Sequence, residues 1–104
     1  MTQLTVVAKI EAKAGAEDYL YQELRHLSTP TLAEVGCINY DLHRALEAKS
    51  LFLFIENWTS RDVWEKHMQS EHIKVFESNT SDVIESWELF LLKPDQVRAA
   101  STQP

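Results

Sequence analysis

The sequence contains one cysteine, two glycines and three prolines among its 104 residues, and these shortages exclude several kinds of protein. Cys37 alone cannot form an intrachain disulfide, which fits a reducing compartment, and we expect a cytoplasmic protein. The glycines, Gly15 and Gly36, lie far apart, so the chain has no glycine-rich loop of the kind that binds phosphate.

Positive charge is also scarce, because 10 lysines and arginines face 16 aspartates and glutamates, for a net charge of −6. Nucleic acids and anionic membrane surfaces attract basic proteins, so this balance argues against both as partners. No apolar run approaches the roughly 20 residues that span a bilayer. Lys9, Glu11 and Lys13 interrupt the apolar residues near the start, so we expect no signal peptide.

The residues that are present are typical of one small folded domain, with 44% apolar and 25% charged residues. We expect this domain to span residues 1–94 and a polar tail to occupy residues 95–104. Alternating apolar residues and turn signals predict four strands, at 4–12, 37–42, 51–58 and 87–92.

Apolar residues at a spacing of three to four predict a helix between the first and second strands, over residues 16–35. Pro30 lacks a backbone donor, so we expect this helix to kink or restart near Ser28 and Thr29. Gly36 is placed to end it. A second helical region follows the third strand, with Ser60 as its cap and a local restart capped by Ser70.

The predicted order is β-α-β-β-α-β, which is typical of a ferredoxin-like α+β fold with its helices on one face of an antiparallel sheet. The third strand, 51–58, is apolar on both faces until Glu56. A strand of this kind is covered on both sides. Helices account for one side, and we expect a second copy of the chain to cover the other, giving a homodimer through the sheet faces.

The stretch from Leu51 to Phe76 gathers most of the side chains that could build a site. His67 and His72 are candidate catalytic bases, because imidazole titrates near neutral pH. Tyr40 and Asn57 could donate hydrogen bonds to a developing oxyanion, and Glu56 could orient a histidine across the sheet. Apolar walls for a small aromatic substrate would come from three further residues: Trp58, Trp64 and Phe76.

Three motifs resemble the antibiotic biosynthesis monooxygenase family of dimeric α/β barrel proteins, above all its quinol monooxygenase branch. They are Glu-Val-Gly-Cys-x-x-Tyr-x-Leu-His from Glu34 to His43, Ile-Glu-x-Trp from Ile55 to Trp58, and His67 with Glu71-His72 before Phe76.

The resemblance implies a barrel made by two sheets and a cavity between the helices and the sheet of each subunit. It also carries His67, His72, Tyr40, Trp58 and Glu56 over as matched site positions. Members of that family with known chemistry oxygenate quinols or polyphenols with O2, without metal or flavin, whereas others degrade haem or isomerise a small sugar derivative.

Structural roles compete with these functional ones. His67 lies between Trp64 and Met68 on an apolar stripe and could be a packed, hydrogen-bonded core histidine. His72 follows the predicted restart and could be a capping or surface residue. Trp58 and Tyr40 could belong to the core or to an interface, and Cys37 is expected to be an inert thiol.

Metal and haem chemistry fit the sequence less well. His67 and His72 are five residues apart, whereas two zinc ligands on one helical face are four apart. In the family that the chain resembles, the haem-degrading members have an asparagine on the first strand that faces the cavity. This chain has Ala8, Lys9 and Ile10 in that region. We therefore expect no metal site and no cofactor. The leading hypothesis is a cofactor-independent monooxygenase, and the alternatives are an isomerase with the same histidines or a non-catalytic binding protein.

Overall fold

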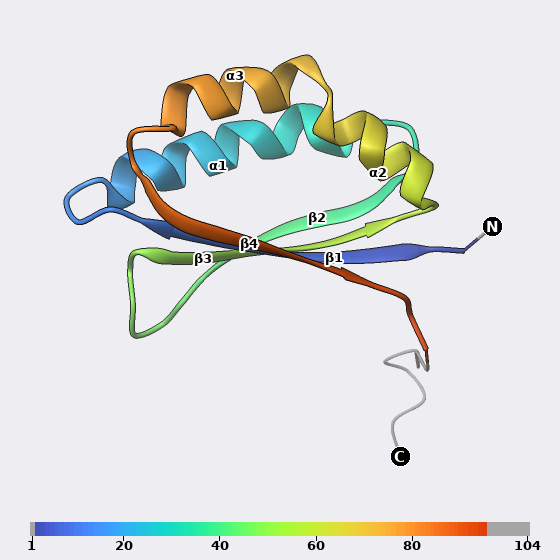
Figure 1. Cartoon of the computed structure of the whole chain (residues 1–104), viewed down its shortest axis with the longest axis horizontal. Coiled ribbons are helices and arrows are strands. Elements are labelled where there is room, and N and C mark those ends of the chain that lie inside the picture. Colours follow the sequence, from blue (N-terminus) through green and yellow to red (C-terminus); the bar gives the residue numbers. More distant parts are fainter. Residues whose placement is uncertain (1, 96–104) are drawn as a thin grey trace.

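Helices cover one face of a four-stranded antiparallel sheet in the computed structural model, which describes residues 2–95 (Figure 1). The elements in chain order are β1 (Leu4–Ala12), α1 (Glu17–Leu32), β2 (Cys37–Arg44), β3 (Leu51–Trp58), α2 (Arg61–Met68), α3 (Glu71–Thr80) and β4 (Ile84–Leu92). The strand order is β2-β3-β1-β4, with every neighbouring pair antiparallel. The predicted ferredoxin-like α+β fold is therefore confirmed. The predicted tail lies outside the described residues, apart from Asp95.

Alternation along the central strands decides which side chains enter the core. On β3, Phe52, Phe54, Glu56 and Trp58 are buried beneath the helices, while the residues between them lie on the other face of the sheet. Val6, Ala8 and Ile10 of β1 are buried in the same layer. This layer, completed by Leu20, Leu24 and Leu27 of α1, forms the single core cluster of residues 2–95.

Local signals set the helix boundaries. The hydroxyl oxygens of Ser60 and Ser70 accept hydrogen bonds from the backbone N–H groups of Val63 and Ile73, so the predicted restart between α2 and α3 is confirmed. The restart expected before Pro30 is wrong, because α1 continues through Pro30 and ends two residues later. Pro30 lies in the last turn, where little helix remains to disrupt. No helix within residues 2–95 is long and apolar enough to cross a membrane.

Three boundaries differ from the prediction. Helix α1 ends at Leu32 with Ala33 as its C-cap, rather than at residue 35 with Gly36 as its stop. Strand β2 continues to Arg44, and β4 begins at Ile84 rather than at Trp87. The polar residues Glu85 and Ser86 hide this early start, because β4 is an edge strand whose side chains are largely exposed. An edge strand can carry polar residues that a central strand would exclude.

Gly36 forms the corner between α1 and β2 and fixes how closely α2 approaches it. Its φ is +91°, and a Cβ there would lie 2.7 Å from Cγ2 of Val63 and 2.8 Å from Oγ1 of Thr59. The carbonyl oxygen of Gly36 accepts a hydrogen bond from the N–H of Thr59 at 2.9 Å. Only glycine combines that backbone conformation with so close a contact. The corner therefore brings the loop after α1 against the start of α2.

Candidate functional site

A cavity of about 550 Å³ lies between the helix layer and the covered face of the sheet. Its lining comes from β1, β2 and β3 below, from α1, α2 and α3 above, and from β4 at one side. The residues that line it include Ala8, Ile10, Leu27, Tyr40, Phe54, Glu56, Trp64, His67, Met68, Ile73, Phe76, Thr80, Trp87 and Leu89. Most of these side chains are apolar, so the cavity suits a small aromatic or aliphatic molecule.

His67 lies in the last turn of α2 and is 1% exposed. Its ring lies 4.8 Å from the Trp58 ring and 5.4 Å from the Tyr40 ring, measured between centroids. The Nδ1 atom lies 2.6 Å from Oε2 of Glu34. The other ring nitrogen, Nε2, has no hydrogen-bond partner among residues 2–95. Every side-chain N or O atom of these residues that is fully shielded from solvent does have a partner, so Nε2 is not fully shielded. Nε2 therefore opens onto the cavity that His67 lines.

Burial lowers the pKa of His67, although the adjacent Glu34 carboxylate opposes the shift. The imidazole is therefore neutral at neutral pH. The Glu34 carboxylate can only accept a hydrogen bond, so the nitrogen that contacts it must be the donor. We therefore assign the single ring proton to Nδ1. This tautomer leaves the lone pair of Nε2 directed at the cavity, which is the state that a general base requires.

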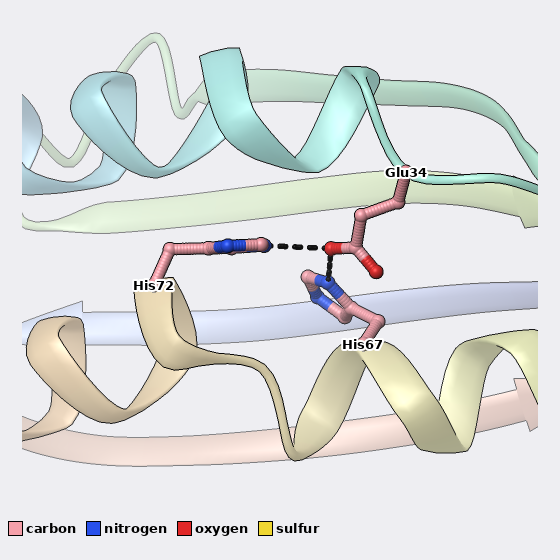
Figure 2. A group of neighbouring side chains, drawn as sticks. All are labelled: Glu34, His67 and His72. Carbon is pink, nitrogen blue, oxygen red and sulfur yellow. Dashed lines mark hydrogen bonds and ion pairs between the residues drawn. The ribbon is translucent and has the colours of Figure 1, made fainter.

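A single oxygen of Glu34 joins two histidines from different helices (Figure 2). Glu34 lies in the loop between α1 and β2, and His72 lies in the first turn of α3. The Nε2 atom of His72 is 2.6 Å from the same Oε2 atom that Nδ1 of His67 contacts. His72 is half-buried and lines a separate groove of about 370 Å³ between α1 and α3.

Glu56 adds a second titratable group to the cavity wall. It is 3% exposed, and burial raises its pKa to about 7, although a hydrogen bond from Nε1–H of Trp58 to Oε1 opposes the shift. Burial likewise raises the pKa of Tyr40 well above its usual range, so its hydroxyl keeps its proton. The cavity thus combines a neutral imidazole, a carboxyl that titrates near pH 7 and a phenol donor.

The family model for antibiotic biosynthesis monooxygenase matches residues 3–78. The chain belongs to this family. It is 33% identical to PA3566 of Pseudomonas aeruginosa, whose crystal structure superposes with a TM-score of 0.88 over 92% of this chain and 97% of that one. It is 30% identical over 81 residues to Rv0793 of Mycobacterium tuberculosis, a proposed monooxygenase, covering 78% of this chain and 79% of that protein.

The mouse N-terminal EF-hand calcium-binding protein 1 carries a similar segment, 29% identical over 66 residues. That segment covers 64% of this chain but 18% of the mouse protein. The chain thus spans only a small part of that relative.

The structure brings most of the predicted site residues of this monooxygenase-family domain together. His67, Tyr40, Glu56, Trp64 and Phe76 line one cavity.

Two predicted residues support the site from outside the cavity. Trp58 lies beneath the site, fully buried against the His67 ring. His72 faces the α1–α3 groove and shares Oε2 of Glu34 with His67.

Asn57 is the exception, because it lies on the face of the sheet away from the helices. Its Oδ1 accepts a hydrogen bond from the hydroxyl of Thr5 at 2.6 Å, and its Nδ2 donates to Oδ1 of Asn39 at 2.9 Å. Adjacent residues of a strand point to opposite faces, so the burial of Glu56 and Trp58 places Asn57 outside. Asn57 is not positioned to contact a molecule in the cavity.

The carboxylate that orients His67 was missed in the sequence, where Glu56 was expected in that role. Glu56 bonds to Trp58, whereas Glu34 bonds to His67. Glu34 is separated from the histidines by 33 and 38 residues, so no local spacing links them. Its position beside Gly36, in the motif that carried the family resemblance, was the available signal.

Proposed function

We propose that this family member is a monooxygenase that oxidises a small quinol or polyphenol with O2 in the 550 Å³ cavity, without a metal or organic cofactor. The observation that carries the proposal is the unpartnered Nε2 of His67, which opens into this cavity while Glu34 holds Nδ1. A base oriented by a carboxylate is the arrangement that activates a hydroxyl group.

The chemistry follows from the residues that line the cavity. Nε2 of His67 removes the proton of a phenolic hydroxyl, and the resulting phenolate supplies the electrons that reduce O2. One oxygen atom forms a bond to a ring carbon and the other leaves as water with the two hydrogens that the phenol loses, giving a quinone. We propose that the hydroxyl of Tyr40, which lines the cavity and keeps its proton, donates a hydrogen bond to the phenolate oxygen.

Oxygen uptake with a panel of hydroquinones and polyphenols tests this proposal. We expect substrate-dependent uptake by the wild type and a loss of roughly 100-fold or more in the His67→Gln variant, the usual contribution of a general base. His43→Gln is the matched control, because His43 is an exposed strand residue away from the cavity. Absence of uptake with every compound in the panel would contradict the proposal.

One observation favours a second function, an isomerase that uses the same side chains without O2. Glu56, with a pKa of about 7, and neutral His67 line the same cavity, and such a pair can deliver and remove protons at two positions of one substrate. Turnover under strict anaerobiosis would support the isomerase and exclude oxygenation. A ligand that raises the melting temperature without forming product would instead identify a binding protein.

We also propose that two copies of the chain associate through the uncovered sheet face. That face carries Ile55, Phe90 and Leu92 as exposed apolar side chains, beside Val7 in the neighbouring strand. Apolar surface of this kind is often an interface. Sedimentation equilibrium should give twice the chain mass, and a stable monomer at micromolar concentration would contradict the proposal. The single cysteine supports a reducing, cytoplasmic location.

A further inference from the structure

We infer that His72 is the proton-exchange partner of His67: it releases a proton to the α1–α3 groove when His67 gains one from the substrate, and regains it when His67 gives that proton up. Glu34 couples the two rings. The inference rests on the proposed function, because it assigns His67 the role of base. It explains how a ring that is 1% exposed can become charged.

The geometry ties both rings to one acceptor. Nδ1 of His67 and Nε2 of His72 are each 2.6 Å from Oε2 of Glu34, a separation that requires a proton between each nitrogen and the oxygen. Both rings therefore donate to the carboxylate, and only their outer nitrogens can gain or lose protons. One carboxylate balances one imidazolium, so the trio is neutral when a single ring is charged.

Repulsion between the rings makes the exchange reciprocal. Their centroids are 5.9 Å apart. At an effective dielectric constant of about 20, two unit charges at this distance shift a protonation equilibrium roughly 100-fold. In the resting state that we infer, His72 carries the positive charge. When Nε2 of His67 takes the substrate proton, that charge becomes unfavourable, and Nδ1 of His72 loses its proton to water. The charge moves from one ring to the other, and the net charge of the trio is unchanged.

The two rings face different spaces. His67 lines the cavity, and His72 lines the groove, whose rim includes the exposed His26, Glu71 and Val75. Leu27 and Phe76 line both spaces and so form the partition between them. Proton exchange at His72 therefore reaches solvent without passing through the space that holds the substrate.

A metal ion is the competing use of these three side chains, whose ligand atoms lie within 4.8 Å of one another. Ligand atoms bound to zinc at 2.0–2.1 Å are separated by roughly 3.3 Å, whereas each nitrogen here lies at the shorter hydrogen-bond distance of 2.6 Å from the Glu34 oxygen. Metal-bound histidines also donate their other N–H to an acceptor, whereas the outer nitrogens here have no partner among residues 2–95. The observations therefore favour proton sharing.

Other titratable groups surround the trio and must be held constant when it is tested. Burial is the main cause of the raised pKa of Cys37, Tyr40 and Glu56, and the charge of Glu34 adds to each shift. The groups that line the groove beside His72 are Glu23, His26 and Glu71.

The test compares wild type with His72→Gln, which keeps an N–H donor for Glu34 but cannot titrate. His26→Gln is the control, because it alters the same groove without touching Glu34. We expect His72→Gln to lower quinol-dependent oxygen uptake about tenfold in dilute buffer and imidazole to restore it. A decrease below twofold, or one that imidazole does not relieve, would overturn the inference.

A titration of the ring 15N resonances tests the coupling without any turnover. We expect the pKa of His67 to rise in His72→Gln, because the competing charge is gone, and to remain unchanged in His26→Gln. Glu34→Gln should make the two rings titrate independently. Unchanged His67 titration in His72→Gln would overturn the inference, as would Zn²⁺ binding that displaces the ring protons at micromolar metal. If no quinol supports uptake while the rings titrate reciprocally, the proposed reaction fails and the exchange stands.

Discussion

Glu56 and Asn57 are neighbours on β3, yet the two faces of the sheet give them opposite environments. Glu56 is buried under the helices, where it lines the cavity and its pKa rises to about 7. Asn57 faces away from the helices and exchanges ordinary hydrogen bonds with Thr5 and Asn39. Removal from water turns the carboxyl group of Glu56 into a candidate for proton chemistry.

The same contrast holds for the histidines. His67 on the covered side has lost almost all contact with water, and burial lowers its pKa. His43 on β2 is exposed, and the only side-chain hydrogen bond it makes within residues 2–95 joins Nδ1 to the backbone oxygen of Asp41. The covered face therefore concentrates the groups that folding keeps out of solvent at a cost in stability.

Glu56→Gln is expected to have the largest effect on the free energy of unfolding, because it removes the buried carboxyl group that distinguishes the covered face. Because the pKa of Glu56 rises from 4.5 to about 7 on folding, the unfolded chain ionises first as pH increases. Wild-type stability should therefore fall between pH 4.5 and 7 relative to the variant, by at most about 3 kcal/mol. Urea unfolding of both proteins across this range measures the difference. A constant difference would show that Glu56 is not desolvated.

Gly36→Ala should have the next largest effect, because it strains the corner that carries Glu34 to His67. The positive φ and the contact with Val63 together should cost about 1–3 kcal/mol of unfolding free energy. Gly15→Ala is the matched control, since Gly15 has a φ of +90° but open space around its Cβ position. We expect Gly36→Ala, and not Gly15→Ala, to reduce turnover as well. Equal effects in both variants would contradict a role for the corner in positioning Glu34.

The smallest effect is expected from Asn57→Ala, one residue along the strand from Glu56. Losing its hydrogen bonds on the uncovered face should cost about 1 kcal/mol. Turnover per folded molecule should remain within about twofold of wild type, since the side chain does not reach the cavity. Steady-state oxygen uptake measures this. A tenfold decrease would contradict the prediction, because it would give the outer face of the sheet a part in catalysis.

Sequence pattern predicted the fold well because β1 alternates between apolar and polar residues along much of its length and β3 is a continuous apolar run bounded by turn signals. Strands β1 and β3 have the predicted boundaries, and Ser60 and Ser70 cap helices as expected. The edge strand β4 was predicted too short, because its exposed polar residues carry no burial signal.

The site was only partly predictable. Alternation along the strand places Asn57 on the opposite face of the sheet from Glu56, so the prediction of Asn57 as a site residue was avoidable. Glu34 was not predictable from spacing, because tertiary packing around Gly36 alone brings its loop to α2. The inferred proton exchange between His67 and His72 was likewise not predictable from the sequence, because it depends on the distance of each ring to Oε2 of Glu34.

The most direct test of the account is the protonation state of His67 with and without a bound quinol. Ring 15N shifts at pH 7.5 should show a neutral imidazole with its proton on Nδ1 and a bare Nε2. Adding hydroquinone should shift the Nε2 resonance towards its protonated position. A proton already on Nε2, or a resonance that no quinol moves, would contradict a base that faces an accessible cavity.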